Sequence, residues 1–361
     1  MLVVTFGEII GRLETPGHLR LRQARDLEVT YTGAEASVAA SICNFGGDAR
    51  YVTALPKHAL AEAAVDAVRA VGVDTSFVLR TDWGRLGMCY MEMGLNQRPS
   101  NVIYDRAYSA IAITDSVEYD WENIFCDADW LHLSGITPAL SAVAAETTLV
   151  AAMVAKDSGC KVSLDLNFHS ALWKWNESNS SRDLARQTIG TLLPFVDVVI
   201  GNEDDYHDVL GIQADKTGFS SGSRKIDCYS EVARTVIDCF PNLSNVAITL
   251  SESLSLSNNN WGAMLYDAKK GQAFFAPLSQ KRTYEPYQIK SVVDSVGCGE
   301  SFAGGLIFAL NTPKLCDPEL AIQYAVAAAC LKHSIKGEFN FSTREEVEAL
   351  MGDTVSRLVL R

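Results

Sequence analysis

The sequence predicts an α/β fold whose central sheet is mostly parallel and covered by helices on both faces. Short β-rich apolar runs alternate with longer runs of helical spacing along most of the chain. Repeated strand–helix units of this kind build parallel sheets that are buried on both faces. In such folds ligands bind beyond the carboxyl ends of the strands, so the polar residues that follow the strands are the first candidates for a site.

The individual elements follow from local patterns. Apolar residues recur at helical spacing in Ala139–Lys156, whereas Leu2–Phe6 is a short, continuous apolar run. By the same criteria the other expected strands are Arg50–Leu55, Trp130–Leu133, Lys161–Asp165, Val196–Gly201 and Val246–Leu250. The other expected helices are Ala36–Phe45, Ala59–Val71, Gly299–Leu310 and Ala321–His333.

Two segments break this rhythm. Arg12–Thr32 and Arg85–Ala112 contain alternating patterns typical of antiparallel ribbons, and we expect them to pair into one small sheet that covers a site. The expected domains are therefore a discontinuous core (1–11, 33–84 and 113–361) and a β-sheet lid (12–32 and 85–112). The polar, low-complexity stretch Ser251–Asn260 predicts a surface loop.

Composition narrows the classes of partner. The chain has 361 residues and a net charge of -13, without a basic cluster, which argues against binding to nucleic acid or to an anionic membrane. No apolar run reaches the roughly 18 residues of a membrane span. The start lacks a basic leader. Nine scattered cysteines without a C-x-x-C pair favour reduced thiols in the cytoplasm.

The strongest chemical signal is the segment from Asp294 to Gly305, where a glycine turn opens into an apolar helix. The unpaired N–H groups of a helix start, together with the helix dipole, form a site for anionic oxygen. Glu300 in the first turn could take a proton from a hydroxyl during phosphoryl transfer. The simpler interpretation is a favourable first-turn acid after a tight connection. No Gly-Lys-Ser/Thr follows, so this is not a Walker loop.

The segment resembles the C-terminal signature of the ribokinase-like (PfkB) carbohydrate kinases, and further motifs resemble the branch of 2-keto-3-deoxygluconate kinases. They occur in family order at Thr5–Glu8, Tyr31–Gly46, Val102–Ala107, Asp165–Asn167 with Leu172–Lys174, Gly201–Asp205 and Cys330–His333. The resemblance implies a three-layer α/β/α core with a β-sheet lid. It also implies transfer of the ATP γ-phosphoryl group to a hydroxyl of a sugar acid, with Mg²⁺.

The resemblance also implies a homodimer formed through the lid, or a higher homo-oligomer, and in some relatives a monovalent cation near Asp294. By position, the catalytic set would be Glu300 as base with Gly297, Cys298 and Gly299 as anion hole. The sugar-binding set would be Gly33, Ala34, Ser37, Tyr90, Tyr104, Arg106 and His169. The nucleotide set would be Asn202, Thr249, Ser251, Gly299 and His333. Glu203 and Asp205 would hold Mg²⁺ through water.

Several of these residues also have simpler interpretations from their local sequence. Arg106 could form a surface salt bridge, and Asn202 could cap a polar helix start. His333 could be a packed core histidine, and Asp165 with Asn167 could tie down a loop.

The chain departs from the family pattern at positions that the resemblance assigns to catalysis or binding. Glu300 stands where the family has Asp, and the extra methylene moves the carboxylate by about 1 Å, a shift that can cost ~100-fold in rate. His169 stands where the family has Arg, which replaces a fixed charge with a group of ordinary pKa ~6.5. Ser37, Thr32, Ser251-Glu252 and Cys298 are further departures. Three hypotheses stay open: a sugar-acid kinase of normal or reduced activity, a pseudokinase with a binding or regulatory role, and a kinase for a neutral sugar such as fructose or for a nucleoside.

Overall fold

A computed structural model of the chain describes residues 1–213, 222–255 and 257–352. Its core is one nine-stranded sheet with the order β14-β13-β12-β11-β10-β9-β1-β4, and β15 pairs with β13. The six strands from β12 to β4 run parallel, and β13, β14 and β15 are antiparallel. The strands are β1 (Leu2–Phe6), β4 (Asp48–Val52), β9 (Trp130–Ser134), β10 (Lys161–Asp165), β11 (Val198–Asn202), β12 (Asn245–Ser255), β13 (Asn258–Asp267), β14 (Gln272–Ala276) and β15 (Tyr287–Ile289).

Helices cover both faces of this sheet, as predicted. The buried apolar residues form two clusters, one on each face of the sheet. Successive residues of β11 alternate between them, because Val198 and Ile200 belong to the first cluster and Val199 to the second. The first cluster packs against α1 (Ala34–Asn44), α2 (Ala59–Arg69), α9 (Cys298–Leu310), α10 (Pro318–Lys332) and α11 (Arg344–Met351). The second packs against α3 (Ala110–Ile113), α4 (Trp121–Phe125), α5 (Ala142–Asp157), α6 (Ser181–Leu192) and α8 (Gly222–Cys239).

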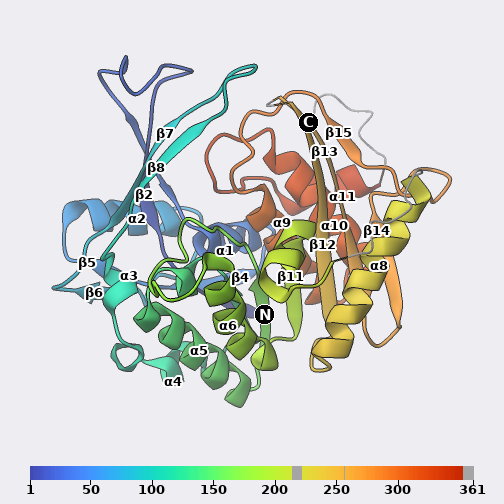
Figure 1. Cartoon of the computed structure of the whole chain (residues 1–361), viewed down its shortest axis with the longest axis horizontal. Coiled ribbons are helices and arrows are strands. Elements are labelled where there is room, and N and C mark those ends of the chain that lie inside the picture. Colours follow the sequence, from blue (N-terminus) through green and yellow to red (C-terminus); the bar gives the residue numbers. More distant parts are fainter. Residues whose placement is uncertain (214–221, 256, 353–361) are drawn as a thin grey trace.

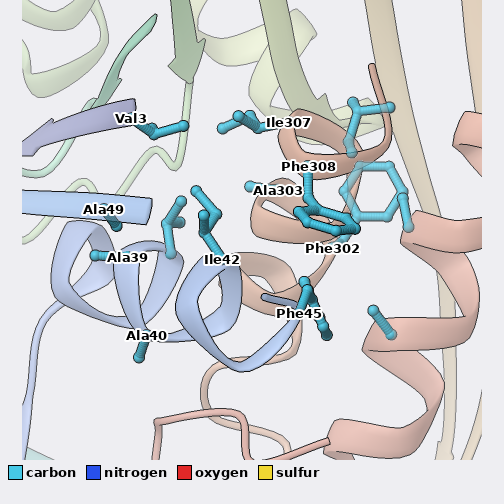
Figure 2. Packing of buried hydrophobic residues seen from close by; sticks show 14 of the residues in the cluster. Val3, Ala39, Ala40, Ile42, Phe45, Ala49, Phe302, Ala303, Ile307 and Phe308 are labelled. Atoms are coloured by element: carbon cyan, nitrogen blue, oxygen red, sulfur yellow. The ribbon is translucent and has the colours of Figure 1, made fainter. Parts of the chain in front are cut away.

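Helix α9 is fixed by the first cluster. Phe302, Ala303 and Ile307 of α9 lie in one cluster with Ile42 of α1 and with Phe45, which follows the last residue of α1 (Figure 2). Phe302, Ala303, Ile307 and Ile42 are fully buried, so α9 has no freedom to rotate without opening voids in a close-packed core. The start of α9, where the glycine turn lies, is thereby held at the carboxyl edge of the parallel strands.

The two segments that break the strand–helix rhythm pair into one small sheet, as expected. We call it the second sheet; it has the order β3-β2-β7-β8, with β2 and β7 parallel and the outer pairs antiparallel. Its strands are β2 (Ile10–Glu14), β3 (Glu28–Thr32), β7 (Gly87–Glu92) and β8 (Asn101–Asp105). They project from one side of the core (Figure 1). A separate pair, β5 (Ala54–Pro56) and β6 (Leu79–Thr81), completes the strands.

The prediction of a surface loop at Ser251–Asn260 was wrong. Strands β12 and β13 run through this stretch as an antiparallel pair, with Ser251 opposite Trp261 and Glu252 opposite Asn260. Polar composition does not prevent strand pairing where β13 has a neighbour on each side, β12 on one and β15 on the other, although the register shifts between Ser253 and Ser255. No helix of the described residues is long and apolar enough to cross a bilayer.

Candidate active site

A cavity of about 500 Å³ lies at the carboxyl ends of the parallel strands, under the second sheet. Four residues of neighbouring strands line it: Glu8 lies just after β1, Asp165 and Asn202 end β10 and β11, and Thr249 of β12 stands beside Asn202 in the sheet. The second sheet contributes the opposite wall, and the start of α9 contributes Gly297, Gly299 and Glu300. Gly33 and Ala34, at the start of α1, complete the predicted sugar-binding side.

The glycine turn before α9 depends on one residue. Gly297, the N-cap of α9, has φ 87°, and a Cβ on it would lie 2.1 Å from the carbonyl oxygen of Glu338. Both the positive φ and the close approach exclude any residue with a side chain. Gly297 and Gly299 line the cavity, which places the start of α9 beside it, and the N–H groups of a helix start bind anionic oxygen.

Glu300 faces the cavity, as the base assignment requires, and it stands in a desolvated environment. Burial raises the pKa of its carboxyl, and the charge of Lys332 opposes this shift. Asn167 Nδ2 lies 3.5 Å from Glu300 Oε1, and Asn167 Oδ1 lies 3.0 Å from His169 Nε2. Asn167 therefore bridges the two positions at which the chain departs from the family pattern.

His169 lines the cavity without supplying a fixed charge. Desolvation at the cavity, and after it the positive charge of Arg106, lower the pKa of His169. The imidazole is therefore neutral at pH 7, which agrees with the sequence argument that an Arg-to-His exchange removes a cation from the pocket.

Glu338 is a cavity residue that the sequence reasoning missed. It follows α10, and its carboxyl is buried close to Glu300. Burial, and after it the negative charge of Glu300, raise the pKa of Glu338 to about 8. Two neighbouring carboxyls therefore share fewer than two negative charges at neutral pH. No local pattern marks Glu338, because only the fold brings it to the glycine turn.

The second sheet presents alternate residues to the cavity. Arg12, Cys89 and Tyr104 stand in one cross-strand row on the facing side, and Arg106 follows Tyr104 by two. Tyr90 belongs to the other face of the sheet and does not line the cavity. Sequence reasoning missed Arg12, Cys89, Met91 and Val102, although the alternation that selects Tyr104 and Arg106 would have found Val102.

Arg106 forms a partly buried ion pair instead of a surface salt bridge. Its Nε donates to Glu8 Oε2 at 2.7 Å, and its Nη2 contacts the same oxygen. The other carboxylate oxygen of Glu8, Oε1, has no hydrogen-bond partner. Both members of the pair line the cavity, so a guanidinium stands where a carboxylate of a ligand could bind.

The nucleotide-binding candidates lie on the far side of α9. Asn202, Thr249 and Ser251 line the cavity together with Trp261, which sequence reasoning missed. Asn202 also caps α7 (Glu203–Asp205) in a capping box with Asp205, so the capping interpretation and the lining position coexist.

Asp205 and Glu203, the Mg²⁺ candidates, differ in orientation. Asp205 lines the cavity, and its oxygens accept from the backbone N–H groups of Phe168 and Asn202 at 3.0 Å each. Burial raises the pKa of Asp205 to about 6. Glu203 instead accepts from Tyr229 Oη at 3.4 Å and does not line the cavity. Among the described residues, no group of three His, Cys, Asp or Glu side chains is placed to hold a metal ion.

Three predicted residues lie behind the cavity wall. Ser37, Cys298 and His333 are buried and do not line it. His333 Nδ1 lies 2.8 Å from the Ala329 carbonyl oxygen and therefore carries the proton, while Nε2 lies 3.2 Å from Asn259 Nδ2 and accepts. His333 is thus a packed core histidine with both ring nitrogens engaged.

Asp294, near which a monovalent cation was expected, already has a cationic partner. Its Oδ2 accepts from Arg12 Nη2 at 3.1 Å and from the Gly337 N–H at 3.1 Å. Its Oδ1 accepts from the Val296 N–H at 3.0 Å. A guanidinium therefore provides the positive charge next to this carboxylate.

Comparison with known proteins agrees with this geometry. The family model of the pfkB family carbohydrate kinases matches residues 2–252. A 2-dehydro-3-deoxygalactonokinase of Haloferax volcanii is 31% identical over 97% of this chain and 96% of the relative. A solved 2-dehydro-3-deoxygluconokinase of Thermotoga maritima is 39% identical, with a TM-score of 0.86 over 98% of this chain and 99% of that one.

A ribokinase-like structure from Escherichia coli in complex with ATP and Mg²⁺, described as a putative ribokinase II, shares the fold at 19% identity. Its TM-score is 0.72, over 97% of this chain and 99% of that one. Matches of this extent, together with a glycine turn, an acid and an arginine-bearing second sheet around one cavity, show that the chain belongs to the pfkB family of carbohydrate kinases.

Proposed function

We propose that this protein is an ATP-dependent kinase of a sugar acid, with 2-keto-3-deoxygluconate or its galactonate epimer as acceptor. The observation that carries the proposal is that Glu300 lines the cavity between the arginine-bearing second sheet and the start of α9. The relatives described above act on 2-dehydro-3-deoxy sugar acids, which supports this class of acceptor.

In the proposed mechanism, the second sheet and the start of α1 hold the sugar acid. Arg106 keeps its pair with Glu8 through Nε and Nη2 and offers Nη1 to the carboxylate of the acceptor, while Tyr104 packs beside it. Glu300 accepts the proton of the attacking hydroxyl, and Asn167 orients its carboxylate. The N–H groups of Gly297, Gly299 and Glu300 stabilise the charge of the transferred phosphoryl group.

ATP would bind on the side of Asn202, Thr249, Ser251 and Trp261. Mg²⁺, when bound, supplies positive charge to the phosphates, and Asp205 is the carboxylate of the described cavity lining placed to orient its water ligands. Glu252 follows Ser251, and its Oε2 accepts from Asn260 Nδ2 at 3.1 Å, so this acid is engaged across the strand pair.

The proposal is tested by ADP release from purified protein with ATP, Mg²⁺ and a panel of acceptors. We expect turnover with 2-keto-3-deoxy sugar acids and a rate at least tenfold lower with fructose, ribose and a nucleoside. Turnover with an uncharged sugar alone would contradict the proposal. Absence of turnover with every acceptor, together with a ligand-induced rise in melting temperature, would instead identify a pseudokinase.

We also propose that the second sheet mediates a homodimer. Val29, Leu13, Tyr90 and Ile103 form one cross-strand row on the face away from the cavity. Val29 and Ile103 are 52% and 50% exposed, which leaves this apolar row without a partner in the single chain.

For this interface we expect Ile103→Asp to shift the molecular mass seen by light scattering from that of a dimer to that of a monomer. Val117→Asp, a change at an equally apolar exposed position outside the second sheet, is the control and should leave the mass unchanged. A wild-type mass of one chain would contradict the proposed dimer.

A further inference from the structure

We propose that Arg12 is a positioning residue that couples the second sheet to the turn carrying Glu300, through its ion pair with Asp294. The coupling is inferred from the contacts of Arg12. Its effect on the reaction rate rests on the proposed kinase function. Nothing in the sequence marks Arg12, since it stands in β2 among residues of no chemical motif.

The ion pair is buried and joins distant parts of the chain. The side chains of Arg12 and Asp294 are 2% and 3% exposed, and 282 residues separate them in sequence. Arg12 Nη2 also donates to Glu14 Oε2 at 2.6 Å on the same strand. The folded protein is strongly destabilised when a buried carboxylate loses its cationic partner. A movement of the second sheet away from Asp294 would therefore cost free energy.

The carboxylate of Asp294 joins Arg12 to the turn that carries Glu300. Three donors meet on its carboxylate: Arg12 from the second sheet, the Val296 N–H from the turn before α9, and the Gly337 N–H from the loop that continues into Glu338. Gly297 follows Val296 and packs directly against the Glu338 carbonyl. A shift of β2 therefore moves the turn whose N–H groups and Glu300 face the cavity.

The other described ion pair from the second sheet to the α10 side of the core is weaker. Lys336 and Glu28 are 54% and 50% exposed, and exposed pairs contribute little in water. Arg12 also keeps two buried donors, Nε and Nη1, without a hydrogen-bond partner. Arg12 lines the cavity, so these two N–H donors can bind a ligand there while Nη2 keeps its bond to Asp294.

The kinetic test uses Arg12→Met, Arg12→Lys, Asp294→Asn and the double variant Arg12→Met/Asp294→Asn. We expect Arg12→Met to lower kcat about 10–100-fold, in line with the cost of misplacing a reacting group, and to change KM for the sugar acid less than about threefold. Arg12→Lys should recover part of kcat. The double variant should be no slower than the slower single variant, because residues that act as a unit are not additive.

Two matched controls separate coupling from loss of charge in the second sheet. Arg85→Met removes an exposed ion pair with Asp105 that stays within the second sheet, and should leave kcat within about twofold. Glu14→Gln removes the charge of the second partner of Arg12 but keeps Asp294, and should cost less than Arg12→Met. Additive losses in the double variant, or an equal loss in Glu14→Gln, would refute the coupling.

Amide hydrogen exchange of the ligand-free protein gives a readout that needs no activity. Arg12→Met, and Arg12→Lys if the Met variant does not fold, should accelerate exchange in residues 294–300 as well as in β2. Arg85→Met should not affect residues 294–300. Faster exchange confined to the second sheet would contradict the proposal even if the protein is an active kinase. Coupled exchange without any turnover would uphold the coupling and reject the kinase function.

Discussion

Replacement of Glu300 by Gln is expected to lower kcat by about 10²–10⁴-fold while the protein stays folded. The amide keeps the size and the hydrogen-bonding capacity of the side chain but cannot accept a proton. Because burial raises the pKa of Glu300, removing its charge relieves a desolvation cost, so the stability of the variant should not fall above neutral pH. Steady-state ADP release and thermal unfolding of the same preparation measure the two effects.

The simpler interpretation of Glu300, an acid placed favourably in a first helical turn, predicts the opposite pattern. Under that interpretation, Glu300→Gln would lower the free energy of unfolding by about 0.3–1 kcal/mol and leave kcat unchanged. Glu122→Gln, in the first turn of α4 and exposed, is the matched control for that effect. If the rate of Glu300→Gln equals that of the wild-type protein, Glu300 is not the base.

The pH dependence of kcat provides a second signature of Glu300. A base must be deprotonated to act, so kcat should fall as pH drops through the raised pKa of Glu300. The loss of rate should therefore begin at a higher pH than an ordinary glutamate pKa of about 4.3 would allow. Glu300→Gln should abolish this limb of the profile in whatever activity it retains.

Local sequence patterns were sufficient for the architecture because each strand and helix carries its own periodicity. Leu2–Phe6 and Lys161–Asp165 were predicted with the bounds that β1 and β10 show. Arg50–Leu55 was predicted as one strand, but the chain turns at Thr53 and divides it between β4 and β5. The Ser251–Asn260 hairpin was missed because its stability comes from pairing on both sides, which no single segment encodes.

Site residues that belong to a sequence motif could be predicted. Site residues that only the fold brings to the cavity could not. Gly297, Glu300 and Arg106 stand in recognisable motifs and line the cavity. Glu338, in the loop after α10, and Arg12, in the middle of β2, reach the same cavity only through the fold, and neither stands in a motif. His333 and Tyr90 show the converse, since family position does not reveal on which side of a wall or a strand a side chain lies.

Replacement of Gly297 by Ala is expected to lower kcat by at least about 100-fold and to destabilise the protein. Its φ of 87° costs roughly 1–2 kcal/mol for a residue with a Cβ. The added carbon would also stand 2.1 Å from the Glu338 carbonyl oxygen, which belongs to the backbone and cannot rotate away. The turn must therefore move, and a displacement of about 1 Å at the reacting groups is enough for this loss of rate.

Gly159→Ala separates the two causes, because Gly159 has nearly the same backbone conformation, with φ 84°, and open space where a Cβ would stand. It should lower the free energy of unfolding by a similar conformational cost and leave kcat unchanged. If both variants lose only stability, the contact between Gly297 and Glu338 does not fix the catalytic turn. A loss of kcat in Gly297→Ala alone, measured below its melting temperature, would show that the packing of Glu338 against the turn, more than the glycine's backbone conformation, sets the position of Glu300.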